Sequence, residues 1–242
     1  MPEPVLELAG LASGYGPVGV VRDLGLVIRE GELAALLGPN GAGKTCALLT
    51  IAGPNRASAG TIRFDGIDVT AERTRHRARR GISLVPEGRQ LFPALTVREN
   101  LSLAATSVGR PVGPGLEIVT ELFPQLVALL AKVAGSLSGG EQQMCAIGRG
   151  IMAGPRLLMI DELSLGLAPV VVERLVEALR RANDELGMTV LFVEQDADLA
   201  IETAERIVVL SMGRKVFDGS AGEATASRDL IEQAYLGLPT GT

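Results

Sequence analysis

One segment decides how the rest of the chain is interpreted: Gly38-Pro39-Asn40-Gly41-Ala42-Gly43-Lys44-Thr45. It matches the phosphate-binding loop pattern G-x-x-x-x-G-K-[ST]. The continuously apolar run Leu33–Leu37 before it predicts a buried strand, and Lys44–Ala52 after it has helical composition and stops at Gly53-Pro54. This pattern binds phosphate when it lies between a strand and a helix, so a chance glycine-rich turn is the weaker explanation.

The residues of this loop predict a nucleotide site over positions 38–46. Glycines let successive N–H groups point at phosphate oxygens, and the following helix adds the positive end of its dipole. Lys44 would neutralise the β- and γ-phosphates, and the Thr45 hydroxyl would bind Mg²⁺. Because Cys46 follows directly, we expect bulky thiol reagents to slow ATP turnover and bound ATP to protect.

Two adjacent carboxylates, Asp161 and Glu162, end the apolar stretch Leu157–Ile160. Open α/β sheets place their ligands at the carboxyl ends of strands. We therefore expect Asp161 to hold Mg²⁺, and Glu162 to accept a proton from the water that attacks the γ-phosphate. Seen alone, two acids here could equally form a solvated turn.

A third segment, Leu137-Ser138-Gly139-Gly140-Glu141, opens a predicted helix that runs to about residue 153. Ser138 and Glu141 fit the S-x-x-E capping box, so a well-capped helix is one interpretation. Capping does not require two glycines, which cost about 1 kcal/mol each relative to alanine inside a helix. Close approach of the backbone N–H groups to an anion explains them better.

The remaining pattern predicts an α/β fold with a mainly parallel, helix-covered sheet. Alternating apolar positions at Leu24, Leu26 and Ile28 indicate a half-buried strand, and residues 61–69 with Asp65-Gly66 indicate a hairpin of a small antiparallel sheet. Residues 95–153 are helical in pattern, with a loop at 109–115. Other predicted elements are strands at 82–85, 157–160, 189–193 and 207–210, helices at 170–186 and 197–204, and a hairpin through Met212-Gly213.

Composition limits the class of protein. The 242 residues suit one large domain, and 47% hydrophobic with only 3% aromatic residues suits buried aliphatic strands. The apolar runs are far shorter than the roughly 18 residues of a membrane span, and the first residues lack the layout of a signal peptide, so we expect a cytoplasmic protein. A net charge of −5 argues against nucleic-acid binding. The two cysteines, Cys46 and Cys145, lie far apart, which indicates neither zinc nor a disulfide framework.

The phosphate loop, the LSGGE segment and the strand ending in Asp-Glu, in this order, resemble the ABC ATPase family over essentially the whole chain. The resemblance implies a P-loop NTPase (RecA-like) core at about 1–94 and 154–221, with a small antiparallel β subdomain. It also implies a helical subdomain at about 95–153, and a C-terminal helix and tail at 222–242. Two subunits would sandwich two ATP molecules head to tail, with Ser138, Gly139, Gly140 and Glu141 on the γ-phosphate of the partner.

Other positions follow from the same resemblance. Tyr15 occupies the place of the aromatic residue that stacks on adenine, although a lone tyrosine in a Gly-rich turn could also be an edge or core residue. Glu87 stands where many members have a Mg²⁺-binding Gln, and Gln195 stands where a switch His is usual. Gln195 can hydrogen-bond the γ-phosphate but cannot take a proton near neutral pH, which leaves Glu162 as the base. Leu163 replaces the usual Pro, with a modest expected effect on the backbone.

The combination of Val-Pro-Glu-Gly-Arg, Ser-Leu-Gly-Leu-Ala-Pro and Val-Glu-Gln is similar to the ATP-binding subunits of branched-chain amino acid importers. Such a subunit would lie on the inner face of the membrane, bound to transmembrane permease subunits and served indirectly by a substrate-binding protein. Closely similar subunits serve urea or other amides. A soluble ABC ATPase in translation or DNA maintenance, and a P-loop small-molecule kinase, are the rival functions; a kinase would leave Gly139 and Gly140 without a purpose.

Two further stretches stay open. The arginines at 73, 75, 77, 79 and 80 could bind a partner or a membrane, but a solvated helix face, with His76 at the surface, is the preferred interpretation. Leu91-Phe92-Pro93 lies where the family forms the groove for a cytoplasmic helix of the permease. A hydrophobic staple within the helical subdomain is the equal alternative.

Overall fold

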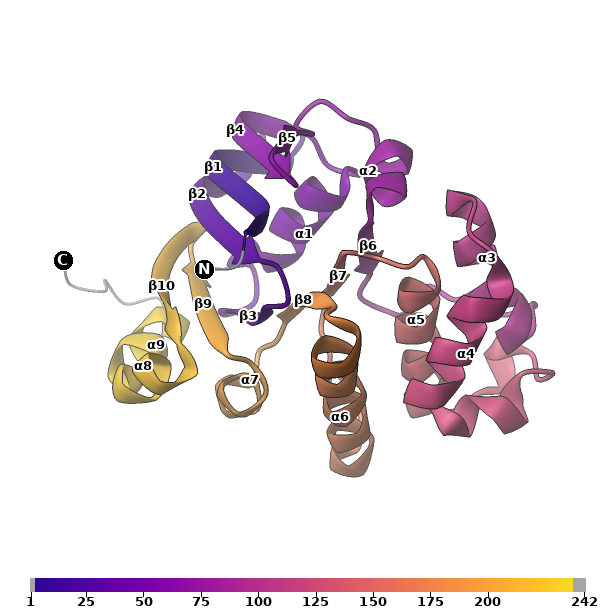
Figure 1. Ribbon diagram of the computed structural model, residues 1–242. Coiled ribbons are helices and arrows are strands. Elements are labelled where there is room, and N and C mark those ends of the chain that lie inside the picture. The colour runs from indigo at the N-terminus through magenta and orange to yellow at the C-terminus, as the bar shows by residue number, and fades with distance from the viewer. Residues whose placement is uncertain (1–2, 237–242) are drawn as a thin grey trace.

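The run Leu33–Leu37 forms strand β3 inside a six-stranded sheet of order β10-β9-β3-β8-β7-β6 (Figure 1). In this computed structural model, residues 3–236 are described. Five strands, β9, β3, β8, β7 and β6, pair parallel with one another, and β10 pairs antiparallel with β9. The other strand bounds are β6 Ile82–Val85, β7 Leu157–Ile160, β8 Thr189–Val193, β9 Arg206–Ser211 and β10 Arg214–Ser220. The predicted mainly parallel sheet is confirmed.

A second, antiparallel sheet has the order β2-β1-β4-β5, with β1 Pro4–Tyr15, β2 Val18–Arg29, β4 Ala57–Phe64 and β5 Ile67–Asp68. The predicted hairpin around Asp65-Gly66 is confirmed by the pairing of β4 with β5. Strand β1 was not predicted. Its register shifts several times against both neighbours, so it lacks the strict alternation that identifies a strand in sequence.

The two faces of the parallel sheet belong to two different hydrophobic clusters. Along β3, Leu33, Ala35 and Leu37 join one cluster, whereas Ala34 and Leu36 join the other. The second cluster also holds the buried face of α1 (Lys44–Ala52) and the inner residues of the antiparallel sheet. Helix α1 therefore lies between the two sheets (Figure 1).

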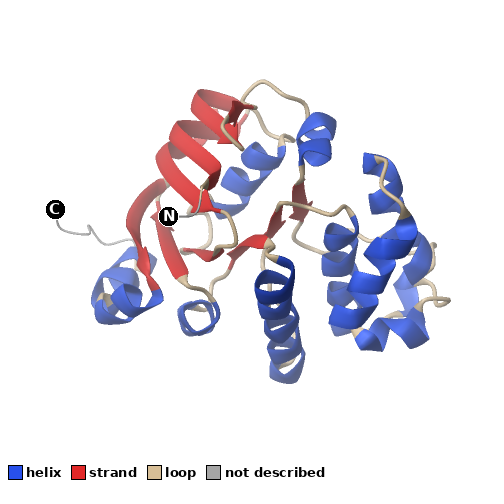
Figure 2. Ribbon diagram, in the orientation of Figure 1, coloured by secondary structure: helices blue, strands red, loops and turns tan. Residues whose placement is uncertain are grey.

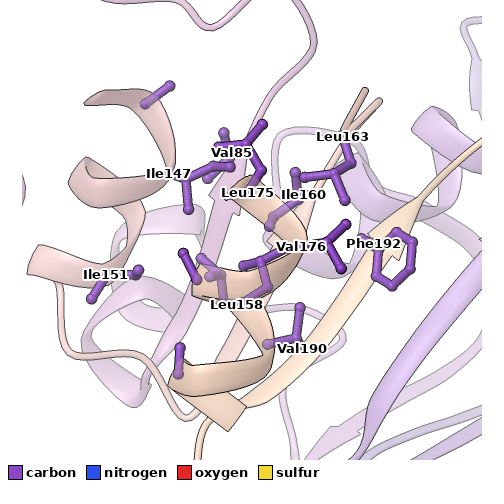
Figure 3. Packing of buried hydrophobic residues seen from close by; sticks show 14 of the residues in the cluster. Val85, Ile147, Ile151, Leu158, Ile160, Leu163, Leu175, Val176, Val190 and Phe192 are labelled. Carbon is purple, nitrogen blue, oxygen red and sulfur yellow. The ribbon is translucent and has the colours of Figure 1, made fainter. Parts of the chain in front are cut away.

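The first cluster covers the opposite face and joins the sheet to the helices α5 (Gly139–Met152) and α6 (Pro169–Leu186). Figure 3 shows Ile147 and Ile151 of α5 and Val176 of α6 against Leu158 of β7. All four side chains are nearly or fully buried. The helix that begins with the LSGGE segment is thus packed directly onto β7, the strand that Asp161 follows.

The helices between β6 and β7 gather on one side of the molecule (Figure 2). They are α3 Val97–Val108, α4 Val112–Leu122, α5 and two short 3-10 turns at Pro124–Leu129 and Ala134–Ser136. The predicted loop at 109–115 is wrong in its second half, because α4 already begins at Val112. Proline is tolerated in the first turn of a helix, where its missing N–H has no partner to lose, so Pro114 does not block this start.

The remaining helices are α2 Thr74–Arg80, α7 Ala197–Thr203, α8 Ala221–Ala226 and α9 Arg228–Tyr235. The single C-terminal helix that we predicted is therefore two helices, and residues 237–242 of the predicted tail lie outside the described residues. Within residues 3–236, no helix combines the length and the apolar character that a bilayer crossing needs.

The arginine-rich stretch is not wholly solvated, which corrects one prediction. His76 and most of the arginines are exposed, but Arg77 is only 2% exposed. Its guanidinium donates to the carbonyl oxygens of Thr50 at 2.6 Å and Ile51 at 2.7 Å, at the end of α1. It also donates to the carbonyls of Thr70 and Glu72. Arg77 therefore fastens α2 to the helix that follows the phosphate loop.

Candidate nucleotide site

The phosphate loop leaves the carboxyl end of β3 and enters α1. Gly38 has φ of +144°, and a Cβ there would lie 2.2 Å from the carbonyl oxygen of Leu210, so only glycine fits. The ammonium group of Lys44 donates to the carbonyl oxygens of Gly38 at 2.6 Å and Pro39 at 3.1 Å. Burial lowers the pKa of Lys44, while Glu162, Asp161 and Glu194 act in the opposite direction. The lysine side chain thus folds back onto the first two residues of the phosphate loop.

Strand β7 brings Asp161 to the first turn of α1. The Thr45 hydroxyl donates to a carboxylate oxygen of Asp161 at 3.2 Å, so two of the three predicted metal ligands are neighbours. Burial raises the pKa of Asp161 to about 6, against the lowering effect of the Thr45 hydrogen bond, and the charges of Glu162 and Glu87 raise it further. Burial therefore disfavours the charged form of this carboxylate.

Glu162 and Gln195 are in direct contact, although 33 positions separate them in the chain. The Gln195 amide donates to a carboxylate oxygen of Glu162 at 2.9 Å. Glu162 has a left-handed backbone with φ of +57°, which costs a non-glycine residue roughly 1 kcal/mol or more. Strained residues persist where the surrounding structure holds them, and they cluster at functional sites.

Glu194 is a buried residue to which the sequence analysis assigned no role. It is 1% exposed, and its two carboxylate oxygens accept the backbone N–H groups of Ser164 at 2.9 Å and Gln195 at 3.0 Å. Glu194 therefore connects Ser164, in the loop after Glu162, to Gln195. An acidic residue directly after the buried strand β8 was the available signal, because buried carboxylates need such partners.

One cavity of about 430 Å³ collects most of the predicted site residues. Tyr15 lies at its edge and is 51% exposed, and burial raises the pKa of this phenol. Cys46 is also in the lining but is only 2% exposed, with its Sγ 3.5 Å from the Ser13 hydroxyl. Ready attack by bulky thiol reagents is therefore not expected after all. The cavity is lined by Tyr15, Val20, Asn40, Gly41, Ala42, Gly43, Lys44, Thr45, Cys46, Glu87, Glu162, Leu165 and Gln195.

The donor set at this cavity fits Mg²⁺. Thr45 and Glu87, which line the cavity, and Asp161, which accepts from Thr45, offer only oxygen atoms, and Mg²⁺ prefers such ligands. No cluster of three or more His, Cys, Asp or Glu side chains suited to a metal occurs in the described part of the chain. Mg²⁺ at nucleotide sites usually has one or two carboxylate ligands and completes its shell with phosphates and water.

The LSGGE segment lies at the start of α5, outside this cavity. Ser138 and Glu141 form the predicted capping box, with the Ser138 N–H donating to the Glu141 carboxylate at 2.7 Å. A Cβ on Gly140 would lie 2.8 Å from Cγ1 of Val171, whereas one on Gly139 would meet only the end of the Arg89 side chain. Packing against α6 thus accounts for Gly140 without an anion, a reason that the sequence did not reveal.

Leu163 has a structural reason to replace proline. Its side chain is fully buried in the first cluster, and its N–H donates to the Val193 carbonyl at 3.2 Å. Proline has no N–H to make this bond. Leucine at this position therefore adds a link between the loop after Glu162 and strand β8.

A parallel sheet with a glycine-rich loop and lysine at one strand end, and an Asp-Glu pair at another, defines a P-loop nucleoside triphosphatase. The family model for ABC transporters matches residues 21–164. This chain belongs to the ABC transporter family, and it is an ATPase that binds nucleotide.

Two relatives match over nearly the full length. The high-affinity branched-chain amino acid transport ATP-binding protein BraG of Pseudomonas aeruginosa is 38% identical over 96% of this chain and 100% of its own length. The probable branched-chain amino acid transport ATP-binding protein LivF of Archaeoglobus fulgidus is 32% identical over 97% of this chain and 99% of its own length.

Solved structures agree with the fold. An ATP-binding subunit of an ABC transporter superposes with a TM-score of 0.83 at 26% identity, covering 96% of this chain and 98% of that one. A dimeric ATP-binding cassette in a post-hydrolysis state with ADP and Pi gives 0.79 at 25% identity, covering 89% and 98%.

Proposed function

We propose that Glu162 is the general base of ATP hydrolysis and that Gln195 orients it. The observation that carries this proposal is the 2.9 Å hydrogen bond between the two side chains, in the cavity that also holds the phosphate loop. The amide can donate to a carboxylate but cannot accept the proton of water, so Glu162 takes that proton. Lys44 exchanges its loop carbonyls for the β- and γ-phosphate oxygens.

Thr45 and Asp161, with Glu87 beside them, hold Mg²⁺ in this proposal. Bound there, the ion supplies positive charge to the β- and γ-phosphate oxygens. The chain contributes a hydroxyl and a carboxylate oxygen that already lie 3.2 Å apart. Tyr15, half-exposed at the cavity edge, stacks on the adenine.

Two such subunits, identical or related, form a head-to-tail dimer around two ATP molecules in this proposal. Residues 138–141 are absent from the lining of the cavity of their own chain, which supports a role on the partner's nucleotide. Ser138 and the N-terminal N–H groups of α5 then meet the γ-phosphate, and ATP stabilises the closed state because it contacts both subunits only there.

The test of the base is the variant Glu162→Gln. We expect it to bind ATP as tightly as the wild type, to dimerise on ATP and to hydrolyse it at least a hundredfold more slowly. Binding is measured with a fluorescent nucleotide, dimerisation by light scattering and turnover by phosphate release. Rapid turnover by Glu162→Gln would overturn the assignment.

The subunit energises import through permease subunits at the inner face of the membrane in this proposal. A groove between α2, α3 and the Phe92 segment offers a docking place; Phe92 is 53% exposed, and its backbone is held by the Asn100 side chain. The Phe92 side chain is thus free for a partner, which favours docking over the alternative of an internal staple. The groove is lined in part by Leu49, Ala52, Ala78, Leu84, Phe92, Leu103 and Ala104.

Branched-chain amino acids are the proposed cargo, because BraG and LivF are named for their transport. The test is uptake of radiolabelled leucine by cells whose own copy is replaced with Glu162→Gln, with wild type as control. Loss of leucine uptake with normal urea uptake supports the proposal. The reverse result would assign the subunit to urea or another amide.

A further inference from the structure

The last described helix ends beside the nucleotide cavity. Helix α9 (Arg228–Tyr235) packs through Ile231 and Ala234, both buried, against the first cluster. The Ser211 hydroxyl at the end of β9 donates to the Ala234 carbonyl at 3.2 Å. These contacts fix the end of the helix, so the next side chain, Tyr235, points from the C-terminal helix towards the switch position.

The phenol of Tyr235 reaches two parts of the site. Its hydroxyl donates to the backbone carbonyl of Gln195 at 2.9 Å. Burial raises the pKa of Tyr235 to about 12, against the opposing effect of a hydrogen bond with the backbone of Gly38, the first residue of the phosphate loop. The phenol therefore keeps its proton at neutral pH and remains a donor to Gln195.

The backbone of Gln195 is held on both sides. Glu194 accepts its N–H at 3.0 Å, and Tyr235 donates to its carbonyl at 2.9 Å. With both groups occupied, the side chain has a fixed starting point from which its amide reaches Glu162 at 2.9 Å. Two hydrogen bonds thus connect α9 to the proposed base: Tyr235 bonds the Gln195 backbone, and the Gln195 side chain bonds Glu162.

We propose that Tyr235 is a positioning residue for hydrolysis, which acts by fixing the Gln195 backbone so that the Gln195 amide orients Glu162. The inference rests on the roles proposed above for Glu162 and Gln195. A displacement of α9 would then displace the Gln195 amide and change the rate of ATP hydrolysis. A helix that merely completes the core would have no such effect.

The experiment compares Tyr235→Phe with Ser211→Ala in the 242-residue chain at one fixed concentration. Both substitutions remove one hydroxyl that makes a hydrogen bond at α9, but only the first removes a bond to Gln195. We expect kcat of Tyr235→Phe to fall about three- to tenfold, as the loss of one hydrogen bond allows, with unchanged ATP affinity. Ser211→Ala should lose a similar amount of thermal stability and keep its kcat.

A double-mutant cycle tests the route of the effect. In a Gln195→Ala background there is no amide to orient, so adding Tyr235→Phe should change kcat by less than about 1.5-fold. An undiminished effect of Tyr235→Phe in that background, or equal kcat losses in Tyr235→Phe and Ser211→Ala, would overturn the inference. Glu162→Gln separates the two proposals: if it still hydrolyses ATP, the proposed roles fail, and if it is inactive while Tyr235→Phe is unaffected, only this inference fails.

Discussion

Asp161 is 3% exposed, and the charges of Glu162 and Glu87 near it are opposed by the charge of Lys44. Because its folded pKa of about 6 lies above the ordinary value of 3.8, the folded state binds more protons than the unfolded state between these values, and stability falls as pH rises through that window. Its charge thus costs stability at pH 8, in the absence of metal.

Replacing Asp161 by Asn should make the metal-free protein more stable at pH 8, by about 2 kcal/mol relative to the wild type, with little difference at pH 4. Asparagine keeps the acceptor for Thr45 but carries no charge. Urea unfolding in EDTA at both pH values measures this, with the exposed Asp184→Asn as control. A gain that is equal at both pH values would contradict the electrostatic cause. ATP hydrolysis should be lost in the same variant.

Several site residues could be predicted because their places follow from the ends of strands. Asp161 comes directly after one apolar run, Lys44 and Thr45 end the glycine-rich loop that follows another, and parallel strands end at a common edge. Glu194 and Tyr235 were missed for a different reason. Their roles depend on hydrogen bonds to backbone groups that only the fold brings near: Ser164 is thirty positions from Glu194, and Gln195 is forty positions from Tyr235.

At the scale of elements, Arg77 connects α2 to the end of α1. Truncation to Ala would leave the carbonyls of Thr50 and Ile51 buried without this donor, so we expect a loss of about 3 kcal/mol or more in the free energy of unfolding. The exposed neighbour Arg75, changed to Ala, should cost less than about 0.5 kcal/mol. Chemical denaturation measures the free energy of unfolding of both variants. Equal losses in the two would show that the hydrogen bonds of Arg77 do not stabilise the fold.

The two glycines at the start of α5 should respond differently to alanine. Gly140→Ala places a methyl group 2.8 Å from Val171, and we expect it to cost about 1–3 kcal/mol by overpacking. Val171→Ala in the same chain should recover most of this loss. Gly139→Ala meets only a flexible Arg89 side chain, so it should fold normally and instead weaken ATP-driven dimerisation. Thermal unfolding and light scattering separate the two effects; a destabilised Gly139→Ala would contradict this assignment.

The elements that could be predicted from the sequence are those whose surroundings require one simple pattern of apolar residues. Strands β3 and β8 are buried on both faces, and all their residues except Thr189 are apolar. Strand β1 has no such signal, because its shifts of register and the left-handed Gly10 break the alternation. Its pairing with two partners, not its own sequence, makes it a strand.

At the scale of the whole molecule, mixing two inactive variants tests whether Lys44 of one subunit and Ser138 of the other serve the same ATP. Lys44→Ala lacks the lysine of the phosphate loop, and Ser138→Arg blocks the start of α5 with the LSGGE segment; each should be inactive alone. A mixture should recover about a quarter of wild-type activity, since half of randomly formed dimers are mixed and each has one intact site of two. Phosphate release measures the recovery. If the mixture stays inactive while light scattering shows mixed dimers, Ser138 and Lys44 do not serve one nucleotide across subunits.

The left-handed backbone of Glu162 has a practical consequence for anyone who engineers this chain. Glycine would relieve that conformation, and such relief is commonly worth about 1 kcal/mol. A screen for heat tolerance alone would therefore enrich glycine at this position and discard the reaction. Thermostable descendants of this sequence have to be selected for growth on the transported nutrient as well as for survival.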